Sequence, residues 1–200
     1  VYGDTNSTLA GALAAAKLDI PVAHVEAGLR SFNKRMPEEI NRVLTDHVSE
    51  LLFAPTQAAV ENLRREGIDI HRVRLTGDVM YDAALFYGAK SDERSGILGS
   101  LGLRAGTYAL ATVHRAENTD DLSRLTAIVQ GLLKVAEQLP VVLPIHPRTK
   151  RALVDHGLMD ILVNKLNVIE PVGYLDMVQL ERHASVIVTD SGGVQKEAYF

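Results

Sequence analysis

The stretch that decides the fold reads Val186-Ile187-Val188-Thr189-Asp190-Ser191-Gly192-Gly193-Val194-Gln195-Lys196-Glu197-Ala198. Its β-branched opening predicts a buried strand, and the Ser-Gly-Gly turn that follows uses backbone angles that glycine tolerates. A helix begins directly after the turn, so its free N–H groups and the positive end of its dipole favour a phosphate. The stretch therefore predicts a phosphate site, although junctions of this kind also occur as purely structural turns.

The rest of the sequence limits the class of ligand. No Walker lysine motif and no G-x-G-x-x-G occurs, which argues against a P-loop nucleotide or a conventionally bound dinucleotide. The chain has no cysteine, no His-Glu-x-x-His and no helical histidine pair, so we expect no metal site. A net charge of −4 argues against a nucleic-acid partner. No run is apolar enough to span a membrane and no signal peptide is present, so we expect a cytoplasmic protein.

Strands and helices alternate along the 200 residues. The predicted strands lie at 20–25, 51–54, 73–76, 108–113, 141–145, 168–169 and 186–189. This alternation predicts an α/β fold with parallel sheets. A polar, glycine-rich stretch at 91–106 is predicted to be a linker between a first domain at 1–90 and a second at 107–200. The chain opens at Val1 without an initiator methionine and stops at Phe200 early in a helix, so we expect a fragment with both domains incomplete.

Polar residues follow almost every predicted strand. In open parallel sheets, ligands bind beyond the carboxyl ends of the strands. Such residues stand at the end of the predicted strands or directly after them, namely Asp4, His24, Glu26, His114, Arg115, His146, Arg148, Asp190 and Ser191. We therefore expect a nucleotide-sugar or phosphate-ester site between two sheets.

Several of these residues also have a purely structural interpretation. Asp4 fits the N-cap of the helix that follows it as well as it fits a site. His24 is better explained as a buried histidine with satisfied hydrogen bonds, and Glu38 and Glu39 could complement the dipole of their helix. Glu26 has no helical position that explains it, and the two potential cations at His114-Arg115 need partners. Function is favoured for these last two sites.

The motifs, taken together, carry a family resemblance. The sequence contains, in order, Gly3-Asp4-Thr5, His24-Val25-Glu26-Ala27-Gly28-Leu29-Arg30, Pro37-Glu38-Glu39-Ile40-Asn41-Arg42, Ala54-Pro55-Thr56, Thr76-Gly77, His114-Arg115-Ala116-Glu117-Asn118 and Thr189-Asp190-Ser191-Gly192-Gly193-Val194-Gln195. This set closely resembles the non-hydrolysing UDP-N-acetylglucosamine 2-epimerases and covers essentially the whole chain. The second and third motifs are the most specific, and hydrolysing relatives usually lack them.

The resemblance implies a fold and an activity. The fold is a pair of Rossmann-like domains that face each other across a cleft, as in GT-B glycosyltransferases, and both would be incomplete here. The reaction is an isomerisation for cell-surface polysaccharide synthesis, which inverts carbon 2 of the sugar without a cofactor. It runs by anti elimination of UDP to 2-acetamidoglucal and re-addition. The partner is a UDP-sugar, the full-length protein is expected to be a homodimer, and this fragment is expected to turn over little or no substrate.

The resemblance also assigns residues. The carried-over catalytic residues are Asp4, Glu26, Glu38 and His114, with Asp4 or Glu26 slightly preferred as the base. The carried-over UDP-binding residues are Ser191, Gly192 and Gly193 at the diphosphate and Glu197 at the ribose, with Arg115 and His146 as softer candidates. Met177 stands where an aromatic residue often lies near the uracil. Such differences leave open a related UDP-2,3-diacetamido sugar as substrate, and a GT-B glycosyltransferase or a UDP-sugar-binding module remains an alternative.

Overall fold

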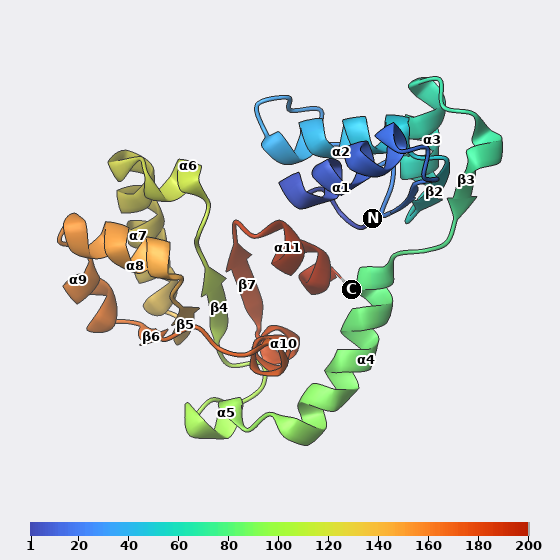
Figure 1. Cartoon of the computed structure of the whole chain (residues 1–200). Coiled ribbons are helices and arrows are strands. Elements are labelled where there is room, and N and C mark those ends of the chain that lie inside the picture. Colours follow the sequence, from blue (N-terminus) through green and yellow to red (C-terminus); the bar gives the residue numbers. More distant parts are fainter. Residues whose placement is uncertain (200) are drawn as a thin grey trace. The chain divides into compact units, whose positions relative to one another are not determined.

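The computed structural model describes residues 1–199 and contains two compact units, Val1–Val79 and the part of the chain from Met80 onward. Each unit holds one sheet, and every strand pairing among the described residues is parallel (Figure 1). The predicted α/β fold is therefore confirmed. Phe200, where the sequence predicts that the last helix is cut off, lies outside the described residues.

The sheet of the first unit has the order β1-β2-β3. Its strands are β1 (Ala23–Val25), β2 (Leu51–Ala54) and β3 (Val73–Leu75). Beside β1, Tyr2 forms a single parallel bridge with Val25. This bridge brings the Gly3-Asp4 turn beside the end of β1.

The helices of the first unit are α1 (Asn6–Lys17), α2 (Pro37–Val48), α3 (Gln57–Arg65) and the short 3₁₀ helix η1 (Ile70–Arg72). Thr5 is the N-cap of α1, because its hydroxyl accepts the Thr8 N–H at 3.2 Å. The capping role considered for Asp4 is therefore wrong. Thr56 caps α3, with its hydroxyl accepting the Ala59 N–H at 3.1 Å.

The two faces of this sheet differ in chemistry. The apolar core on the α3 side contains the buried residues Ala27, Leu52, Ala54, Ala59, Leu63, Ile68 and Val73. Helix α2 instead buries polar side chains, namely Glu39, Asn41, Thr45 and Asp46. Since buried polar groups require partners, the second set indicates an internal hydrogen-bond network in this unit.

The sheet of the second unit has the order β6-β5-β4-β7, which places β7 at an edge. The sequence predicts a buried strand at 186–189, but at this edge Val186 is 43% and Val188 37% exposed, so that part of the prediction is wrong. Its strands are β4 (Ala109–Thr112), β5 (Val141–Pro144), β6 (Asn167–Ile169) and β7 (Val186–Thr189). Ala109 and Ala111 belong to one core cluster, whereas Leu110 belongs to another. Successive side chains of a strand point to opposite faces, so this sheet is covered on both sides.

The helices of the second unit are α4 (Val79–Arg94), α5 (Ile97–Ser100), α6 (Ala116–Thr119), α7 (Leu122–Ala136), α8 (Pro147–Asp155), α9 (Met159–Val163), α10 (Tyr174–His183) and α11 (Gly192–Tyr199). Residues of α7, α8 and α9 cover one face of the sheet, and residues of α5 and α10 cover the other (Figure 1). This doubly wound arrangement leaves the carboxyl ends of β4, β5 and β7 on a common edge.

The stretch 91–106 differs from the predicted polar linker. Helix α4 continues to Arg94, and Leu98, Leu101 and Leu103 pack against the core cluster that contains Leu110. The Ser91 hydroxyl is buried 2.9 Å from Oε1 of Gln179 in α10. Because of these contacts the compact unit begins at Met80, ahead of the predicted linker.

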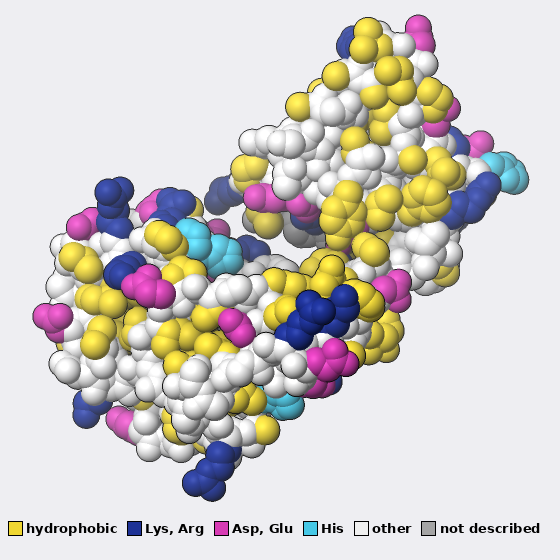
Figure 2. All heavy atoms as spheres, turned by 60° about the horizontal axis from the view of Figure 1, so that its bottom comes forward, with side chains coloured by type: hydrophobic (Ala, Val, Ile, Leu, Met, Phe, Trp, Pro, Cys, Tyr) yellow, Lys and Arg dark blue, Asp and Glu magenta, His cyan; other side chains and the backbone are white. Residues whose placement is uncertain are grey.

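Three general findings concern the surface charges, the helices and the side chains that could bind a metal. Figure 2 shows Lys and Arg side chains interspersed with Asp and Glu side chains on the face in view, with no single basic field. Among residues 1–199, no helix combines the length and the apolar character needed to cross a bilayer. The same residues contain no group of three or more His, Asp or Glu side chains arranged to hold a metal ion.

Candidate active site

The turn between β7 and α11 has the geometry of an anion site. The Ser191 N–H donates to the Thr189 hydroxyl at 2.9 Å, and the Ser191 hydroxyl lies 3.4 Å from the Val194 N–H. Gly192 and Gly193 are the first residues of α11, where backbone N–H groups have no carbonyl acceptor within the helix. The turn therefore directs N–H groups and the positive end of the helix dipole beyond the sheet, as predicted.

A cavity of about 190 Å³ lies beside this turn. Its polar lining residues are Thr112, His114, His146 and Ser191. Its apolar lining comes from Pro144, Pro171, Val172, Met177 and Val194. Three of the residues predicted for the site thus share one cavity at the carboxyl ends of the strands.

Asp190 fixes the loop that carries two of the predicted residues. Its carboxylate accepts the backbone N–H of His114 at 3.0 and 3.1 Å and that of Arg115 at 3.0 Å. It also accepts the Asn118 side-chain amide at 2.9 Å and lies 3.3 Å from Nδ1 of His114. One carboxylate therefore ties the loop after β4 to the turn after β7.

His146 caps helix α8. Its Nδ1 accepts the Arg148 N–H at 3.2 Å, so in a neutral ring the proton resides on Nε2. The rings of His146 and His114 lie with centroids 5.8 Å apart. The Arg148 guanidinium pairs instead with the Asp120 carboxylate at 2.8 Å, so it is engaged away from the histidines.

Arg115 lies close to the glycine turn. A Cβ atom placed on Gly192 would sit 3.8 Å from Nη2 of Arg115. The only acidic partner of this guanidinium among the described residues is Glu117, at 3.9 Å. A cation therefore lies near the N–H groups of α11, which reinforces the attraction for an anion.

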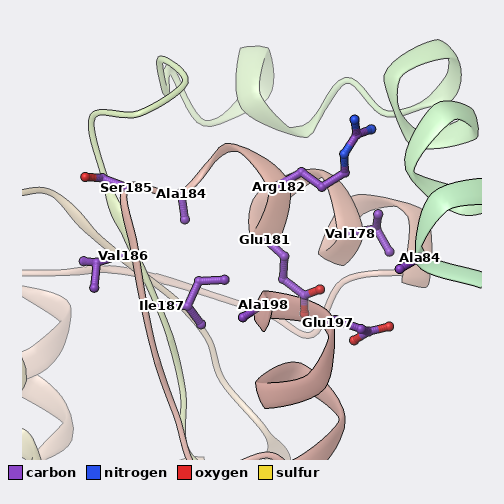
Figure 3. Close-up of a pocket in the computed structure, with 10 residues that line it drawn as sticks. All are labelled: Ala84, Val178, Glu181, Arg182, Ala184, Ser185, Val186, Ile187, Glu197 and Ala198. Atoms are coloured by element: carbon purple, nitrogen blue, oxygen red, sulfur yellow. The ribbon is translucent and has the colours of Figure 1, made fainter. Parts of the chain in front are cut away.

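Glu197 lies in a separate cavity. This space of about 570 Å³ is also lined by Glu181, Arg182, Ser185 and Ile187 (Figure 3). The Tyr174 hydroxyl donates to Glu197 Oε1 at 3.0 Å, and burial followed by the Glu197 charge raises the pKa of Tyr174 to about 12. The structure thus places Glu197 on α11 one turn after the glycines, but not in the cavity that Ser191 lines.

Glu181 is a buried acid beside Glu197. It is 8% exposed, and its Oε1 has no hydrogen-bond partner among residues 1–199. Burial, with a smaller contribution from the Glu197 charge, raises the pKa of Glu181 to about 8. Figure 3 shows the Glu181 side chain running from α10 toward α11.

In the first unit, Asp4 is held by α2. Its carboxylate pairs with the Arg42 guanidinium at 2.5 Å, and its carbonyl accepts the Asn41 amide at 2.9 Å. Arg42 also lies 3.3 Å from Glu39. Asn41 and Arg42 of the third motif therefore position Asp4.

Glu26 has an unusual backbone. Its φ of 76° lies in the left-handed region, which is costly for a residue with a side chain. Its N–H and that of Ala27 both donate to the Phe53 carbonyl, at 3.1 and 3.0 Å. A Cβ placed on Gly3 would lie 3.9 Å from Glu26 Oε2, so the Glu26 carboxylate lies beside the Gly3-Asp4 turn.

The adjacent glutamates of α2 have opposite environments. Glu39 is 3% exposed and accepts the Ser31 N–H at 2.9 Å and the Phe32 N–H at 2.8 Å. Burial by itself raises the Glu39 pKa, but these bonds and Arg42 outweigh it and hold the pKa below its ordinary value. Glu38 is exposed and makes no hydrogen bond or ion pair with residues 1–199.

His24 is part of a buried network, as the structural interpretation predicts. Its Nδ1 lies 2.6 Å from Asp46, and its Nε2 lies 2.9 Å from the Gly3 carbonyl. Asp46 also pairs with Arg30 at 2.8 Å, and Arg30 pairs with Glu66 at 2.6 Å. Burial alone lowers the Arg30 pKa, but Glu66 and Asp46 together raise it above its ordinary value.

Comparison with known proteins identifies the family. The family model described as "UDP-N-acetylglucosamine 2-epimerase" matches residues 1–200. The chain belongs to the UDP-N-acetylglucosamine 2-epimerase family. A Methanocaldococcus jannaschii UDP-N-acetylglucosamine 2-epimerase is 50% identical over 99% of this chain. A Pseudomonas aeruginosa UDP-2,3-diacetamido-2,3-dideoxy-D-glucuronate 2-epimerase is 53% identical over all of it.

Solved structures of 2-epimerases share the fold. The M. jannaschii enzyme in complex with UDP-GlcNAc and UDP aligns with a TM-score of 0.90 at 50% identity, over 99% of this chain and 56% of that one. The Neisseria meningitidis enzyme bound to UDP-GlcNAc aligns with a TM-score of 0.85 at 34% identity, over 99% and 55%. Two Rossmann-like units of the GT-B kind are therefore confirmed. The chain spans about half the length of the curated relatives it matches, 55% and 56% of the two named above.

Sequence reasoning found the residues at the turn but gave no role to those that hold them. It singled out the Ser191-Gly192-Gly193 turn, His114, Arg115 and His146. It gave no role to Asp190, Arg42 or Tyr174. Asp190 directly precedes Ser191 at a strand end, and Arg42 lies within the third motif, so both had a sequence signal. Tyr174 had none.

Proposed function

We propose that the protein is a non-hydrolysing UDP-N-acetylglucosamine 2-epimerase, an isomerase that interconverts UDP-N-acetylglucosamine and UDP-N-acetylmannosamine. The observation that carries this proposal is the cavity in which His114, His146 and Ser191 meet at the N-terminus of α11. Such an arrangement suits a diphosphate, and the M. jannaschii relative is described in complex with UDP-GlcNAc and UDP.

The UDP group would be held by several elements of the second unit. The N–H groups of Gly192 and Gly193, the Ser191 hydroxyl and the His114 ring would contact the diphosphate, with Arg115 nearby. The apolar lining of the cavity, including Met177, suits the uracil ring. Glu197, on the adjacent turn of α11, would accept hydrogen bonds from the ribose hydroxyls. The Tyr174 hydroxyl, which donates to Glu197, would orient its carboxylate.

The chemical steps are an elimination and its reversal. A carboxylate removes the proton on carbon 2, the electron pair forms the double bond to carbon 1, and the bond from carbon 1 to the UDP oxygen breaks. UDP and 2-acetamidoglucal result. UDP then adds back to carbon 1 while carbon 2 is protonated on its other face, so atoms and charge balance. The site must hold UDP through both steps, which is why firm diphosphate contacts matter.

Asp4, Glu26 and Glu38 are the proposed acids. The ion pair with Arg42 holds the Asp4 carboxylate in place. Glu26 lies beside it on a strained backbone, and such strain is concentrated at functional sites. Glu38 is exposed, although its neighbour Glu39 is anchored. The base is proposed to be Asp4 or Glu26, and Glu26→Gln and Asp4→Asn would each lower turnover by about 100-fold or more.

The decisive experiment is a solvent exchange. The protein is incubated with UDP-N-acetylglucosamine in deuterated water, both as the 200-residue chain and as a longer polypeptide of the length of its relatives. Deuterium at carbon 2 of the recovered sugar supports epimerisation by the longer form. UDP release that requires an acceptor would instead indicate a glycosyltransferase, and UDP binding without exchange would indicate a binding module. The 200-residue chain is expected to show little or no turnover.

A second substrate is favoured by a specific observation. The P. aeruginosa relative, 53% identical, is named for a UDP-2,3-diacetamido-2,3-dideoxy-D-glucuronate. Parallel assays with that sugar nucleotide and with UDP-N-acetylglucosamine would show which has the higher kcat/KM. The predicted homodimer is tested by sedimentation of the longer form, and the predicted cytoplasmic location by cell fractionation.

A further inference from the structure

Resting on the proposed function, we propose that Asp190 is the positioning residue of the UDP site. It holds His114 and Arg115 at a fixed distance from the Ser191-Gly192-Gly193 turn. Asp190 belongs to the turn after β7, whereas His114 and Arg115 belong to the loop after β4. These strands are neighbours in the sheet, with Thr112 paired to Thr189. A single carboxylate therefore joins the two segments that would contact the diphosphate.

The contacts of Asp190 are concentrated on one loop. Both carboxylate oxygens accept the His114 N–H, at 3.0 and 3.1 Å, and Oδ2 also accepts the N–H of Arg115 at 3.0 Å and the Asn118 amide at 2.9 Å. Hydrogen bonds to a charged acceptor are stronger than neutral ones. All four bonds come from residues 114–118. The carboxylate therefore fixes the position of the loop after β4 relative to the turn after β7, to which Asp190 belongs.

The histidine ring is oriented by the same group. Nδ1 of His114 lies 3.3 Å from Asp190 Oδ1, which accepts but cannot donate. The proton on Nδ1 therefore faces the carboxylate, and Nε2 is directed away from it. The His114 side chain is 40% exposed and the Asp190 side chain 13% exposed, so the ring is accessible while its anchor is nearly covered. A carboxylate behind a histidine fixes its tautomer and orientation in many active sites.

The test compares Asp190→Asn with a matched control. Asparagine keeps the shape, but its one carbonyl oxygen replaces two acceptors, and its NH₂ would face backbone N–H groups that have no other acceptor. Calorimetric titration of the longer polypeptide with UDP is expected to show a Kd at least about ten-fold higher for this variant. Asp120→Asn removes another carboxylate of the same unit, one that pairs with Arg148 on the surface, and should leave the Kd within about two-fold.

A spectroscopic readout separates positioning from general destabilisation. In ¹⁵N spectra of the ligand-free protein, Asp190→Asn should change the tautomer pattern of His114. It should leave that of His146 unchanged, because His146 Nδ1 accepts the Arg148 N–H instead. A double-mutant cycle with His114→Ala should be non-additive: once the ring is removed, Asp190→Asn should weaken UDP binding less than it does in the wild type.

The outcomes are distinct. A wild type that does not bind UDP contradicts the proposed function. A wild type that binds UDP, with an Asp190→Asn variant that binds equally and keeps the His114 pattern, contradicts only the positioning role. If Asp190→Asn does not fold, Asn118→Ala removes one of the four bonds and should raise the Kd by about two- to five-fold with the fold retained. An unchanged Kd in that variant would count against the proposal.

Discussion

Each unit places a histidine beside an aspartate, and the two pairs differ in how completely their hydrogen bonds are satisfied. His24 and Asp46 have side chains that are 0% exposed, and both ring nitrogens of His24 have partners. His114 is 40% exposed, and only its Nδ1 faces a carboxylate. The first pair has no atom left for a ligand, whereas the second presents Nε2 outward. The same two residue types therefore stabilise the fold in one unit and form a candidate site in the other.

The most demanding test of this difference is to remove the aspartates. Asp46→Ala would leave His24, Arg30 and the Gly28 N–H without their shared acceptor inside the first unit. Breaking a buried charge pair in this way costs about 3–5 kcal/mol. We expect a loss of that size in the free energy of unfolding, measured by urea denaturation with a probe in the first unit. Asp190→Ala should lower the free energy of unfolding less than Asp46→Ala does, and it should weaken UDP binding more.

Equal losses in the free energy of unfolding for the two variants would show that the two histidine–aspartate pairs do not differ in their contribution to stability. Asp155→Ala, an exposed position at the end of α8, is the control for the urea measurement and should change stability by less than about 0.5 kcal/mol.

The next test concerns the glycine that the buried pair supports. Gly28 has a φ of 80°, and a Cβ there would collide with the Ala59 carbonyl and lie 2.9 Å from Leu63. Gly28→Ala should therefore cost at least about 1–3 kcal/mol, because both the backbone and the packing must shift. Gly131→Ala within α7 meets nothing within 4 Å and should be neutral or stabilising by up to about 1 kcal/mol. Thermal unfolding of both variants, compared at the same pH, distinguishes the two cases, and a tolerated Gly28→Ala would contradict the packing argument.

The sequence predicts the fold well because the physics of the elements is local. The β-branched runs at 141–145 and 186–189, and threonine caps such as Thr56, act within a few residues. The stretch 91–106 is predicted to be a linker because it is rich in glycine and charged residues. It also contains Leu98, Leu101 and Leu103, which are partly buried against the core cluster that contains Leu110. Composition alone does not distinguish a linker from a segment that packs on a distant sheet.

The site is less predictable than the fold, because its supporting contacts join distant residues. The pair of Arg42 with Asp4 spans 38 residues, and the bond from Asn118 to Asp190 spans 72. Spacing along the chain gives no sign of such contacts. The motif resemblance names the residues at the site, but only the structure shows that Asn41 and Arg42 hold Asp4, while Glu38 in the same motif remains exposed.

Glu38 and Glu39 repeat the comparison within a single helix turn. Glu39 accepts three hydrogen bonds from Ser31 and Phe32, so Glu39→Gln should cost about 1–3 kcal/mol. Its folded pKa is lowered, so this stabilisation is present above the unfolded pKa and is lost as the pH falls through the lower, folded value. Glu38→Gln should leave stability within about 0.5 kcal/mol while lowering turnover. Urea unfolding at pH 7 and pH 3 and the epimerase assay measure these two effects. A large loss of stability in Glu38→Gln, or no loss in Glu39→Gln, would contradict the assignment.

Glu181 provides the effect that changes most gradually with pH. It is buried without the partners that Asp46 and Glu39 have. Its pKa is about 8 in the folded protein against an ordinary value of 4.5, so the folded state retains a proton that the unfolded state has lost. Stability of the second unit should therefore fall as the pH rises from about 4.5 to about 8, by at most about 1.4 kcal/mol per pH unit, and level off above that range. Glu181→Gln removes the titrating group and should flatten this slope, with variant and wild type most alike near pH 4. Denaturation curves at pH 5, 6.5 and 8 measure the slope. A wild type whose stability does not decline over that range would mean that Glu181 ionises freely, and that its unpartnered Oε1 finds an acceptable environment in the cavity it shares with Glu197.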